Sequence, residues 1–292
     1  MKNLTLENIA KACNGSYHGS EAQANQEVQS IFTDSRKAAK GGLFVPIKGA
    51  RVDAHDFINQ VMEAGALATL SEKDLGETNF PYIKVESSLQ AVKDIAEFYL
   101  KQLEIPVVGI TGSVGKTSTK EMIAAVLGQK YNVLKTEGNL NNEIGLPLTI
   151  FKIREEHQVA VLEMGISEFG EMDRLSTMAN PDICVITNIG LCHLENLITR
   201  DGILKAKTES FAHLTPDGIA VLNGDDDKLC DKKVVNGKPA VFYGIEKAAK
   251  VAETEEGTKT LAEKTVYATN VEAVDLTGTK AAIHYPSKET GG

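Results

Sequence analysis

The sequence predicts an α/β protein with a small N-terminal α/β domain over residues 1–84 and a larger domain over residues 85–292, built on a doubly wound, mostly parallel sheet. Three observations lead to this prediction. Strand-like and helix-like segments alternate along the chain, which is typical of α/β folds. Several apolar runs are continuous, as in strands that a parallel sheet buries on both faces. The length of 292 residues also suits about two domains.

Residues 1–84 carry the elements of the smaller domain. Thr5 is a suitable N-cap for a short helix, which Asn14-Gly15 would end. Apolar residues at helical spacing predict a second helix over 55–66. Short apolar segments rich in strand-forming residues predict strands at 41–47, 66–70 and 82–85.

The larger domain continues the alternation. Helical spacing of apolar residues predicts a helix over 87–103. Continuous apolar runs predict buried strands at 105–111, 159–162, 183–187 and 219–222. From about residue 247 the chain becomes polar and charged, which predicts a surface hairpin or excursion. Residues 264–285 predict two or three strands with a turn at Thr277-Gly278, and we expect the chain to be a fragment of a longer protein.

Composition and charge exclude several classes of protein. Hydrophobic residues make up 42% of the chain, which is too apolar for a disordered protein. The 31 Lys and Arg against 40 Asp and Glu give a formal charge of −9, which argues against a general nucleic-acid binder. No apolar run approaches the ~20 residues needed for membrane insertion, and the N-terminus has no apolar core of a secretory signal.

The cysteines favour a reducing compartment. The four cysteines are far apart in the sequence and form no C-x-x-C pair, so we expect free thiols in a cytoplasmic protein. We expect one of them, Cys184, to lie in the core because it belongs to the apolar run ICVIT.

The strongest chemical signal is the segment VVGITGSVGKTSTKEM, residues 107–122, in which an apolar strand, a glycine-rich turn and a helix follow one another. Gly112 and Gly115 allow close approach of the backbone to an anion, and the helix start presents amides to it. Lys116 supplies a charge for phosphates, and the Thr117 hydroxyl suits Mg²⁺. The strict phosphate-loop pattern places a glycine at position 110, which is Ile110 here. The alternative is a generic glycine-rich turn before a helix.

Three downstream residues are candidates for the same site. Glu163 ends the apolar strand VAVLE, where a carboxylate suits Mg²⁺, although a surface acid is the alternative. His193 follows the next strand, and a hydrogen-bonded loop histidine is its alternative because Mg²⁺ prefers oxygen ligands. Lys207 lies in a predicted helix, and read alone it is a solvated lysine.

Two polar segments are candidates for substrate contacts. The loop GNLNNEIG, residues 138–145, is either a turn or a polar cluster that hydrogen-bonds a substrate. The segment NGDDD, residues 223–227, follows the strand at 219–222 and is either a helix cap or a nucleotide contact.

These motifs together resemble the Mur ligase family, through TGSVGKT and the segments 136–149, 162–172 and 187–211. The resemblance covers essentially the whole chain and extends to residues 33–57. It implies ATP-driven amide-bond formation with Mg²⁺ on a three-domain fold, of which this chain contains the UDP-sugar substrate domain and a P-loop ATPase domain that is incomplete at its end. The resemblance also implies a third, C-terminal domain, which we expect to be missing from this chain.

The three segments and residues 33–57 resemble the family members that join D-alanyl-D-alanine to UDP-N-acetylmuramoyl-tripeptide in peptidoglycan synthesis. The resemblance implies an acyl phosphate intermediate and a monomer. Two alternatives stay open. One is another Mur-family ligase with a different amine or acceptor, and the other is a nucleotide-binding module that, as a fragment, does not turn its ligands over.

The resemblance also implies roles for individual residues. The catalytic residues would be Lys116, His193 and Lys207. ATP would be bound by Gly112, Ser113, Val114, Gly115, Lys116, Thr117 and Ser118, with Asn223 and Asp226 near the adenosine. Metal ligands would be Thr117, Glu163, His193 and a carbamylated Lys207. Substrate would be bound by Ser35, Arg36, Asn139, Asn141, Asn142 and Arg200, with Lys48, Asp53 and His55 as further candidates. The segment ENLITRDGILKAK departs from the family pattern by lacking a glycine while retaining Arg200.

Overall fold

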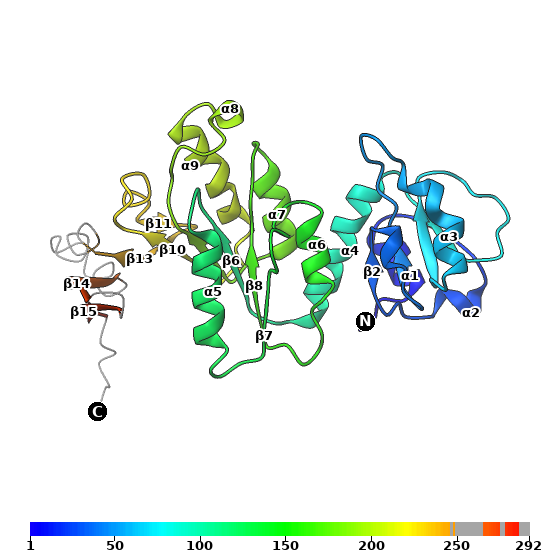
Figure 1. Cartoon of the computed structure of the whole chain (residues 1–292), viewed down its shortest axis with the longest axis horizontal. Coiled ribbons are helices and arrows are strands. Elements are labelled where there is room, and N and C mark those ends of the chain that lie inside the picture. Colours follow the sequence, from blue (N-terminus) through cyan, green and yellow to red (C-terminus); the bar gives the residue numbers. More distant parts are fainter. Residues whose placement is uncertain (246–247, 249–264, 275–277, 286–292) are drawn as a thin grey trace. The chain divides into compact units, whose positions relative to one another are not determined.

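The computed structural model describes residues 1–245, 248, 265–274 and 278–285 (Figure 1). It confirms the predicted fold class, because most of the described strands form two mostly parallel sheets with helices packed on them, and only β11 (Val234–Val235) and β12 (Lys238–Pro239) form a separate antiparallel pair. The chain divides into two compact units, residues 1–105 with 130–160, and residues 106–129 with the described part of 161–292. The predicted domain boundary after residue 84 stays a prediction.

The first unit contains a five-stranded sheet in the order β1-β5-β4-β3-β2. Strands β2 to β5 are mutually parallel, and β1 pairs with β5 antiparallel. The carboxyl ends of β2 to β5 therefore meet at one edge of the sheet and their amino ends at the other. The strands are β1 (Ser16–His18), β2 (Ile31–Phe32), β3 (Leu43–Phe44), β4 (Ala68–Ser71) and β5 (Tyr82–Lys84).

Short helices connect these strands. Thr5 caps α1 as predicted, since its hydroxyl accepts a hydrogen bond from the Asn8 amide at 3.1 Å. The segment predicted as one helix over 55–66 is a 3₁₀ turn followed by an α-helix, and Asp53 caps the 3₁₀ turn. The helices are α1 (Leu6–Ala12), α2 (Glu21–Ala24), η1 (Ser35–Lys37), η2 (Ala54–Phe57) and α3 (Ile58–Glu63).

Two further helices belong to this unit, α4 (Ser88–Leu103) and α6 (Gly145–Ile150). They pack on each other, and the buried Tyr99 hydroxyl donates to the Ile153 carbonyl at 2.7 Å. The Lys93 ammonium of α4 lies 3.2 Å from a carboxylate oxygen of Glu143, in the loop that precedes α6. The asparagine-rich loop is therefore tied to α4.

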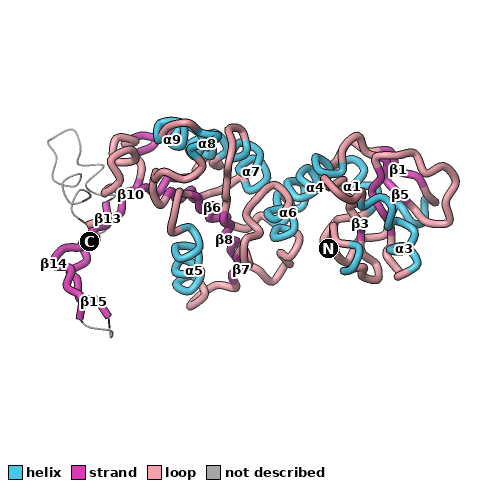
Figure 2. The backbone as a smooth tube through the Cα atoms, turned by 45° about the horizontal axis from the view of Figure 1, so that its top comes forward, coloured by secondary structure: helices cyan, strands magenta, loops and turns pink. Residues whose placement is uncertain are grey.

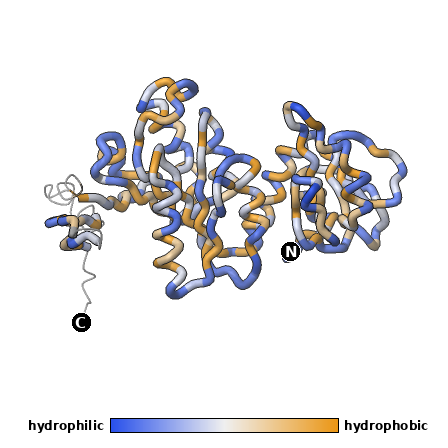
Figure 3. Tube along the Cα trace, in the orientation of Figure 1, coloured by the Kyte–Doolittle hydropathy of each residue, from blue (hydrophilic) through white to orange (hydrophobic). Residues whose placement is uncertain are grey.

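The second sheet has the strand order β15-β14-β13-β10-β9-β6-β8-β7. Strands β6 and β10 both pair with β9 in parallel, and the carboxyl ends of all three lie at one edge. Hydrophobic residues concentrate along the strands, whereas the connecting loops are mainly hydrophilic (Figure 3). The central strands are β6 (Val107–Thr111), β7 (Val133–Lys135), β8 (Val159–Glu163), β9 (Ile183–Ile186), β10 (Ile219–Asn223) and β13 (Val241–Gly244).

Four helices and a 3₁₀ turn accompany this sheet in the second unit. Helix α5 contacts β6, whereas α7, α8, α9 and η3 pack on one another, as Figure 2 shows for α7 to α9. Cys184 is fully buried in β9 as predicted. The elements are α5 (Lys116–Leu127), α7 (Glu171–Ala179), α8 (Leu194–Leu197), α9 (Arg200–Thr208) and η3 (Glu209–His213), with the short strands β11 (Val234–Val235) and β12 (Lys238–Pro239).

The last described elements are the antiparallel strands β14 (Thr265–Val274) and β15 (Gly278–His284). They agree with the strands predicted over 264–285. The predicted excursion lies almost wholly outside the described residues, and so does Thr277 of the predicted turn. Among the described residues, no helix combines the length and the apolar character required to cross a bilayer.

Candidate functional site

The glycine-rich turn lies between the buried strand β6 and helix α5. Gly112 has a φ of +146° and Gly115 a φ of +79°, conformations that residues with a side chain rarely adopt. A Cβ atom on Gly112 would lie 1.8 Å from the Thr187 hydroxyl, whereas a Cβ atom on Gly115 would meet nothing within 4 Å. The turn therefore needs Gly112 for space and conformation, and Gly115 for conformation alone.

The different surroundings of Gly112 and Gly115 predict different losses of stability when each is replaced by alanine. Gly112→Ala should lower the free energy of unfolding by about 3 kcal/mol or more, because backbone strain and a steric clash add together. Gly115→Ala should lower it by only about 1–2 kcal/mol, the cost of a left-handed residue. Urea unfolding of both variants beside the parent chain measures the two losses, and equal losses would contradict this account of the turn.

The loop that follows β9 holds the turn in place. The Ser113 amide donates to the Asn188 carbonyl at 3.0 Å, and the Val114 amide donates to the Asn188 side chain at 3.1 Å. The Thr187 hydroxyl donates to the Val114 carbonyl at 2.6 Å, and the Gly190 amide donates to the Ser113 hydroxyl at 2.8 Å. These contacts make the turn rigid before any ligand binds.

The amides that remain for an anion are those of the helix start. Helix α5 has Gly115 as its N-cap without a side-chain cap, and its first intrahelical bond runs from the Thr119 amide to the Gly115 carbonyl. The amides of residues 116–118 precede that bond and so have no intrahelical acceptor. Together with the positive end of the helix dipole they form a site suited to a phosphate.

Lys116 lies over the same turn. Its ammonium group donates to the Gly112 carbonyl at 2.8 Å and to the Ser113 carbonyl at 3.5 Å. The backbone thus holds the positive charge above the turn, where a phosphate bound at the helix start would meet it.

Thr117 and Glu163 meet although they are far apart in the sequence. The Thr117 hydroxyl lies 3.0 Å from a carboxylate oxygen of Glu163, which ends β8 and is 2% exposed. Two oxygen donors at this distance are the kind of pair that Mg²⁺ prefers. The alternative of a surface acid for Glu163 is wrong, because the side chain is buried.

Lys120 also belongs to this cluster, although no sequence motif singles it out. Its ammonium lies 3.8 Å from the carboxylate of Glu163 and 3.2 Å from that of Glu121, and the residue is 1% exposed. Its spacing in the sequence could have indicated this position. Lys120 comes three residues after Thr117, so both residues lie on one side of α5. A buried lysine of this kind requires a nearby negative charge, which β8 supplies.

Lys207 is buried in α9 and is not the solvated lysine that its sequence context alone would give. Burial, with a smaller contribution from the positive charge of Lys116, lowers the pKa of its ammonium from 10.5 to about 8. A substantial fraction of Lys207 is therefore a neutral amine near pH 8.

The low pKa of Lys207 predicts how stability depends on pH. Below about pH 8 both the folded and unfolded states carry the proton, so the buried charge is destabilising. Between about pH 8 and pH 10.5 the folded state has lost the Lys207 proton while the unfolded state still holds it. The free energy of unfolding therefore rises over this range by up to about 3 kcal/mol, as the penalty of the buried charge disappears.

Lys207→Met should therefore be more stable than the parent chain at pH 7, and the difference should shrink as the pH approaches 10. Urea unfolding of both chains across this range measures it. Parallel stability profiles of the two chains would contradict the assignment of a depressed pKa.

His193 and Arg200 follow β9, and the structure gives them different surroundings. His193 is exposed at the N-cap of α8 with a φ of +57°. Among the described residues no three His, Cys, Asp or Glu side chains cluster as a metal site would require. The Arg200 guanidinium makes two hydrogen bonds to Asp227, at 2.9 and 2.6 Å, and donates to the Ile189 carbonyl. Arg200 thus braces the loop after β9.

Asn223 and Asp226 also make structural contacts in this region. The Asn223 side chain donates to the Thr187 carbonyl at 2.9 Å, and the Asp226 carboxylate accepts from the Ile189 amide at 2.8 Å. Asp226 also accepts from the amides of Lys228 and Leu229, as a cap does. Both residues therefore link the end of β10 to the loop that supports the phosphate turn, and their contacts with adenosine stay a prediction.

The predicted substrate residues other than Arg200 belong to the first unit. The Asn142 side chain accepts hydrogen bonds from the amides of Ile144 and Gly145, where α6 begins, whereas Asn139 is exposed and Asn141 is half-buried. Ser35 and Arg36 follow β2, and Arg36 forms an exposed ion pair with Asp34 at 2.8 Å. This guanidinium lowers the pKa of Asp34 to about 2.

The additional candidates Asp53 and His55 form a hydrogen-bonded pair at 2.6 Å. The Glu72 amide donates to the second ring nitrogen of His55, so the first ring nitrogen carries the proton that Asp53 accepts. Hydrogen bonds from His55 lower the pKa of Asp53 to about 2. Lys48 forms a short backbone bridge to Asp53, which places all three candidates together.

The second unit combines a mostly parallel sheet, a glycine-rich turn at the end of a central strand and a lysine-bearing helix start. Together these features define an α/β protein of the phosphate-loop class. The Mur ligase middle-domain model matches residues 110–284, and the Mur ligase catalytic-domain model matches residues 27–108. The chain belongs to the Mur ligase family, as its sequence motifs predict.

Relatives of known identity agree with this assignment. The UDP-N-acetylmuramoyl-tripeptide–D-alanyl-D-alanine ligase of Bacillus subtilis is 41% identical over 261 residues, which are 87% of this chain and 56% of the relative. The crystal structure of MurF from Acinetobacter baumannii superimposes with a TM-score of 0.82 at 31% identity, covering 97% of this chain and 58% of that one.

A further structural relative is the MurF ligase of Thermotoga maritima in complex with ADP, with a TM-score of 0.75 at 32% identity over 88% of this chain and 56% of that one. The chain thus spans little more than half the length of these relatives.

Proposed function

We propose that this chain comprises the UDP-sugar-binding and ATP-binding parts of an ADP-forming ligase that joins D-alanyl-D-alanine to UDP-N-acetylmuramoyl-tripeptide. The names of the relatives support the reaction, and the ADP complex of the Thermotoga maritima relative supports the nucleotide. The observation that carries the proposal is the pairing of Thr117 with the buried Glu163 at 3.0 Å, directly beside the turn that Lys116 covers.

In this proposal the phosphates of ATP lie at the start of α5. The amides of residues 116–118 and the ammonium of Lys116 face the phosphate oxygens and offset their charge. The contacts from Thr187, Asn188 and Gly190 keep the turn in place, so little reorganisation is needed when the nucleotide binds. Asn223 ends β10, a strand that pairs with β9, and Asp226 follows it, and we propose that both lie near the adenosine.

A Mg²⁺ ion fits the oxygen donors of Thr117 and Glu163, which would hold it beside the phosphates. When bound, the ion neutralises charge on the phosphoryl group that is transferred. Lys120 approaches the same carboxylate from the interior of the protein and keeps its charge balanced when no ion is there.

Lys207 is suited to modification by CO₂, which reacts only with a neutral amine. Its burial and its pKa of about 8 supply that amine near neutral pH. The carbamate formed at its amino nitrogen would turn a buried cation into an anion with two oxygens, a donor type that Mg²⁺ accepts. We propose His193 as a further ligand at that second metal position.

The reaction then needs positioning more than covalent help from the protein. The terminal carboxylate oxygen of the tripeptide attacks the γ-phosphorus of ATP, and ADP leaves with the electron pair of the broken bond. The amine of D-alanyl-D-alanine then attacks the acyl carbon, phosphate leaves, and the amine loses a proton. We propose that Ser35, Arg36, Asn139, Asn141, Asn142 and Arg200 contribute to binding the UDP-linked substrate.

The experiment that tests the proposal measures binding and turnover separately. Calorimetry of this chain with ATP and with UDP-N-acetylmuramoyl-tripeptide should show both ligands binding. The full-length protein should release phosphate with D-alanyl-D-alanine as the amine but not with a single amino acid. Phosphate release with an amino acid instead would favour another ligase of the family, and nucleotide binding without turnover by the full-length protein would favour a binding module.

A further inference from the structure

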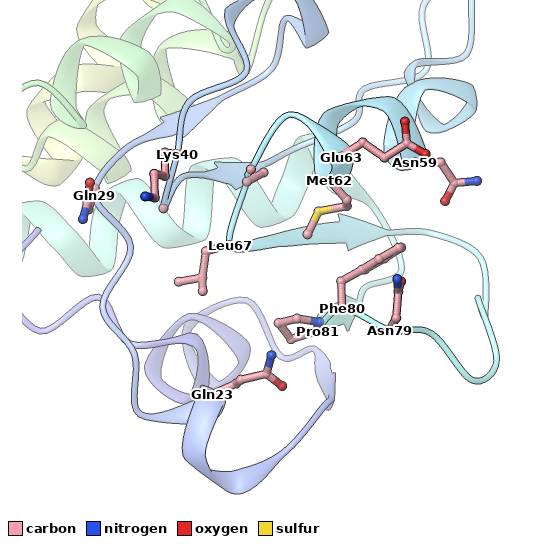
Figure 4. Close-up of a pocket in the computed structure, with 13 residues that line it drawn as sticks. Gln23, Gln29, Lys40, Asn59, Met62, Glu63, Leu67, Asn79, Phe80 and Pro81 are labelled. Carbon is pink, nitrogen blue, oxygen red and sulfur yellow. The ribbon is translucent and has the colours of Figure 1, made fainter.

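A cavity lies in the first unit, at the edge of the five-stranded sheet that holds the amino ends of its parallel strands. It has a volume of about 630 Å³, which is within the range of small-molecule sites (Figure 4). Its lining residues come from the segments that precede the parallel strands β2, β3, β4 and β5. Ser35 and Arg36 follow β2 and so lie at the other edge of the sheet. The cavity is therefore separate from the predicted UDP-sugar residues.

Hydrogen bonds between the loops keep this cavity open and fixed. The Gln29 amide donates to the Gly41 carbonyl at 2.9 Å, and the Gly41 amide donates to the Gly65 carbonyl at 3.1 Å. The Leu67 amide donates to the Gly42 carbonyl at 2.8 Å. Three successive loops are thus tied to one another around the cavity, so a ligand would find the site already formed.

The floor of the cavity is apolar. Met62, Leu67, Phe80 and Pro81 lie around its middle in Figure 4, and Met62 and Phe80 rest on the buried core of the unit. An aromatic ring beside a proline offers a flat surface to the C–H groups of a ligand.

The walls of the cavity carry carboxamide groups. The side chains of Gln29, Asn59 and Asn79 make no hydrogen bond within the part of the chain that the structure describes. Gln23 uses its oxygen to accept from Ser20, which leaves its NH₂ group to donate. A carboxamide both donates and accepts, so the walls match ligand groups that do the same.

The charge of the cavity excludes phosphorylated ligands. Lys40 and Glu63 lie on different sides of it and their charges cancel. Helix α3 reaches the cavity with its carboxyl-terminal end, where carbonyl groups repel anions. An extended peptide is also disfavoured, because the cavity lies at the ends of strands and offers no free strand edge for pairing.

We propose that this cavity binds an uncharged sugar of one or two rings. Its hydroxyl groups both donate and accept, as the carboxamides of Asn59 and Asn79 do, and its C–H face matches the ring of Phe80. The site is independent of the proposed ligase reaction.

The test uses the ¹⁵N-labelled chain, titrated with cellobiose and with N-acetylglucosamine and followed by NMR. At least one of these sugars should shift the backbone amides of Gly41 and Gly65 and the side-chain NH₂ signals of Asn59 and Asn79, with saturation. Asn59→Ala and Asn79→Ala should each weaken binding about tenfold, as expected for loss of one or two hydrogen bonds. Gln60→Ala, on the same helix as Asn59 but outside the cavity, should bind as the parent does.

Three outcomes would overturn the proposal. One is the absence of shifts at the cavity with both sugars, and another is that shifts occur only near Ser35 and Arg36. The third is that trialanine or inorganic phosphate shifts the cavity signals while neither sugar does. Asn59 and Asn79 are exposed, so their variants should keep the remaining spectrum unchanged, which shows that each variant is folded.

Discussion

Replacing Lys116 with alanine should abolish turnover in the full-length ligase and weaken ATP binding by this chain at least about thirtyfold. The ammonium group lies over the phosphate turn, 2.8 Å from the Gly112 carbonyl, where it would offset the charge of bound phosphates together with the backbone amides of the helix start. Truncating one partner of a close charge pair costs about 2–5 kcal/mol, which corresponds to this loss of affinity or more. Calorimetric titration with ATP and Mg²⁺ measures the effect.

Lys130→Ala is the matched control for this experiment, since it removes an exposed lysine just beyond the other end of α5. It should leave ATP affinity within about twofold of the parent, because surface substitutions away from a site have small effects. Thermal unfolding should show that both variants are folded. Unchanged ATP affinity in Lys116→Ala would refute the placement of phosphates at this turn.

Replacing Lys120 with methionine should lower the free energy of unfolding by about 3 kcal/mol or more. The substitution keeps the aliphatic volume but removes a cation 3.8 Å from the buried carboxylate of Glu163. Breaking a buried ion pair by removing one partner typically costs about 3–5 kcal/mol, because the other charge stays in the interior. Urea unfolding in the absence of metal measures this loss.

A double-mutant cycle with Glu163→Gln separates this pair from general packing effects. Once Glu163 is neutral, Lys120→Met should cost much less than it does in the parent, with a coupling of about 1–3 kcal/mol. Lys120→Arg should not preserve the stability of the parent chain. The planar guanidinium group of arginine is larger than the lysine ammonium, which is buried at this position. Strictly additive effects of Lys120→Met and Glu163→Gln would show that the two charges do not interact.

The sequence predicted the fold class and the phosphate turn for a local physical reason. A continuous apolar run that ends in glycines and continues as a helix is compatible with few other backbones, and β6, Gly112, Gly115 and α5 are found where the pattern places them. Thr5 as a helix cap follows from the same kind of reasoning, since the interaction spans only three residues.

The ends of helices and strands were less predictable from the sequence than their presence. The strand predicted over 41–47 has two residues, Leu43–Phe44, and the helix predicted over 55–66 begins as a 3₁₀ turn. Apolar residues mark both strands and the buried loops beside them, so the pattern alone does not show where pairing stops.

The amino-acid sequence by itself determined the kind of protein: an α/β chain of the Mur ligase family with a glycine-rich turn for an anion. Only the tertiary structure decided which distant residues join that turn. It placed Thr117 beside Glu163, buried Lys120 and Lys207, and brought Asn188 to the amides of the turn. The physical reason is that local conformation depends on neighbours within a few residues, whereas burial and charge pairing depend on strands that meet only when the sheet forms.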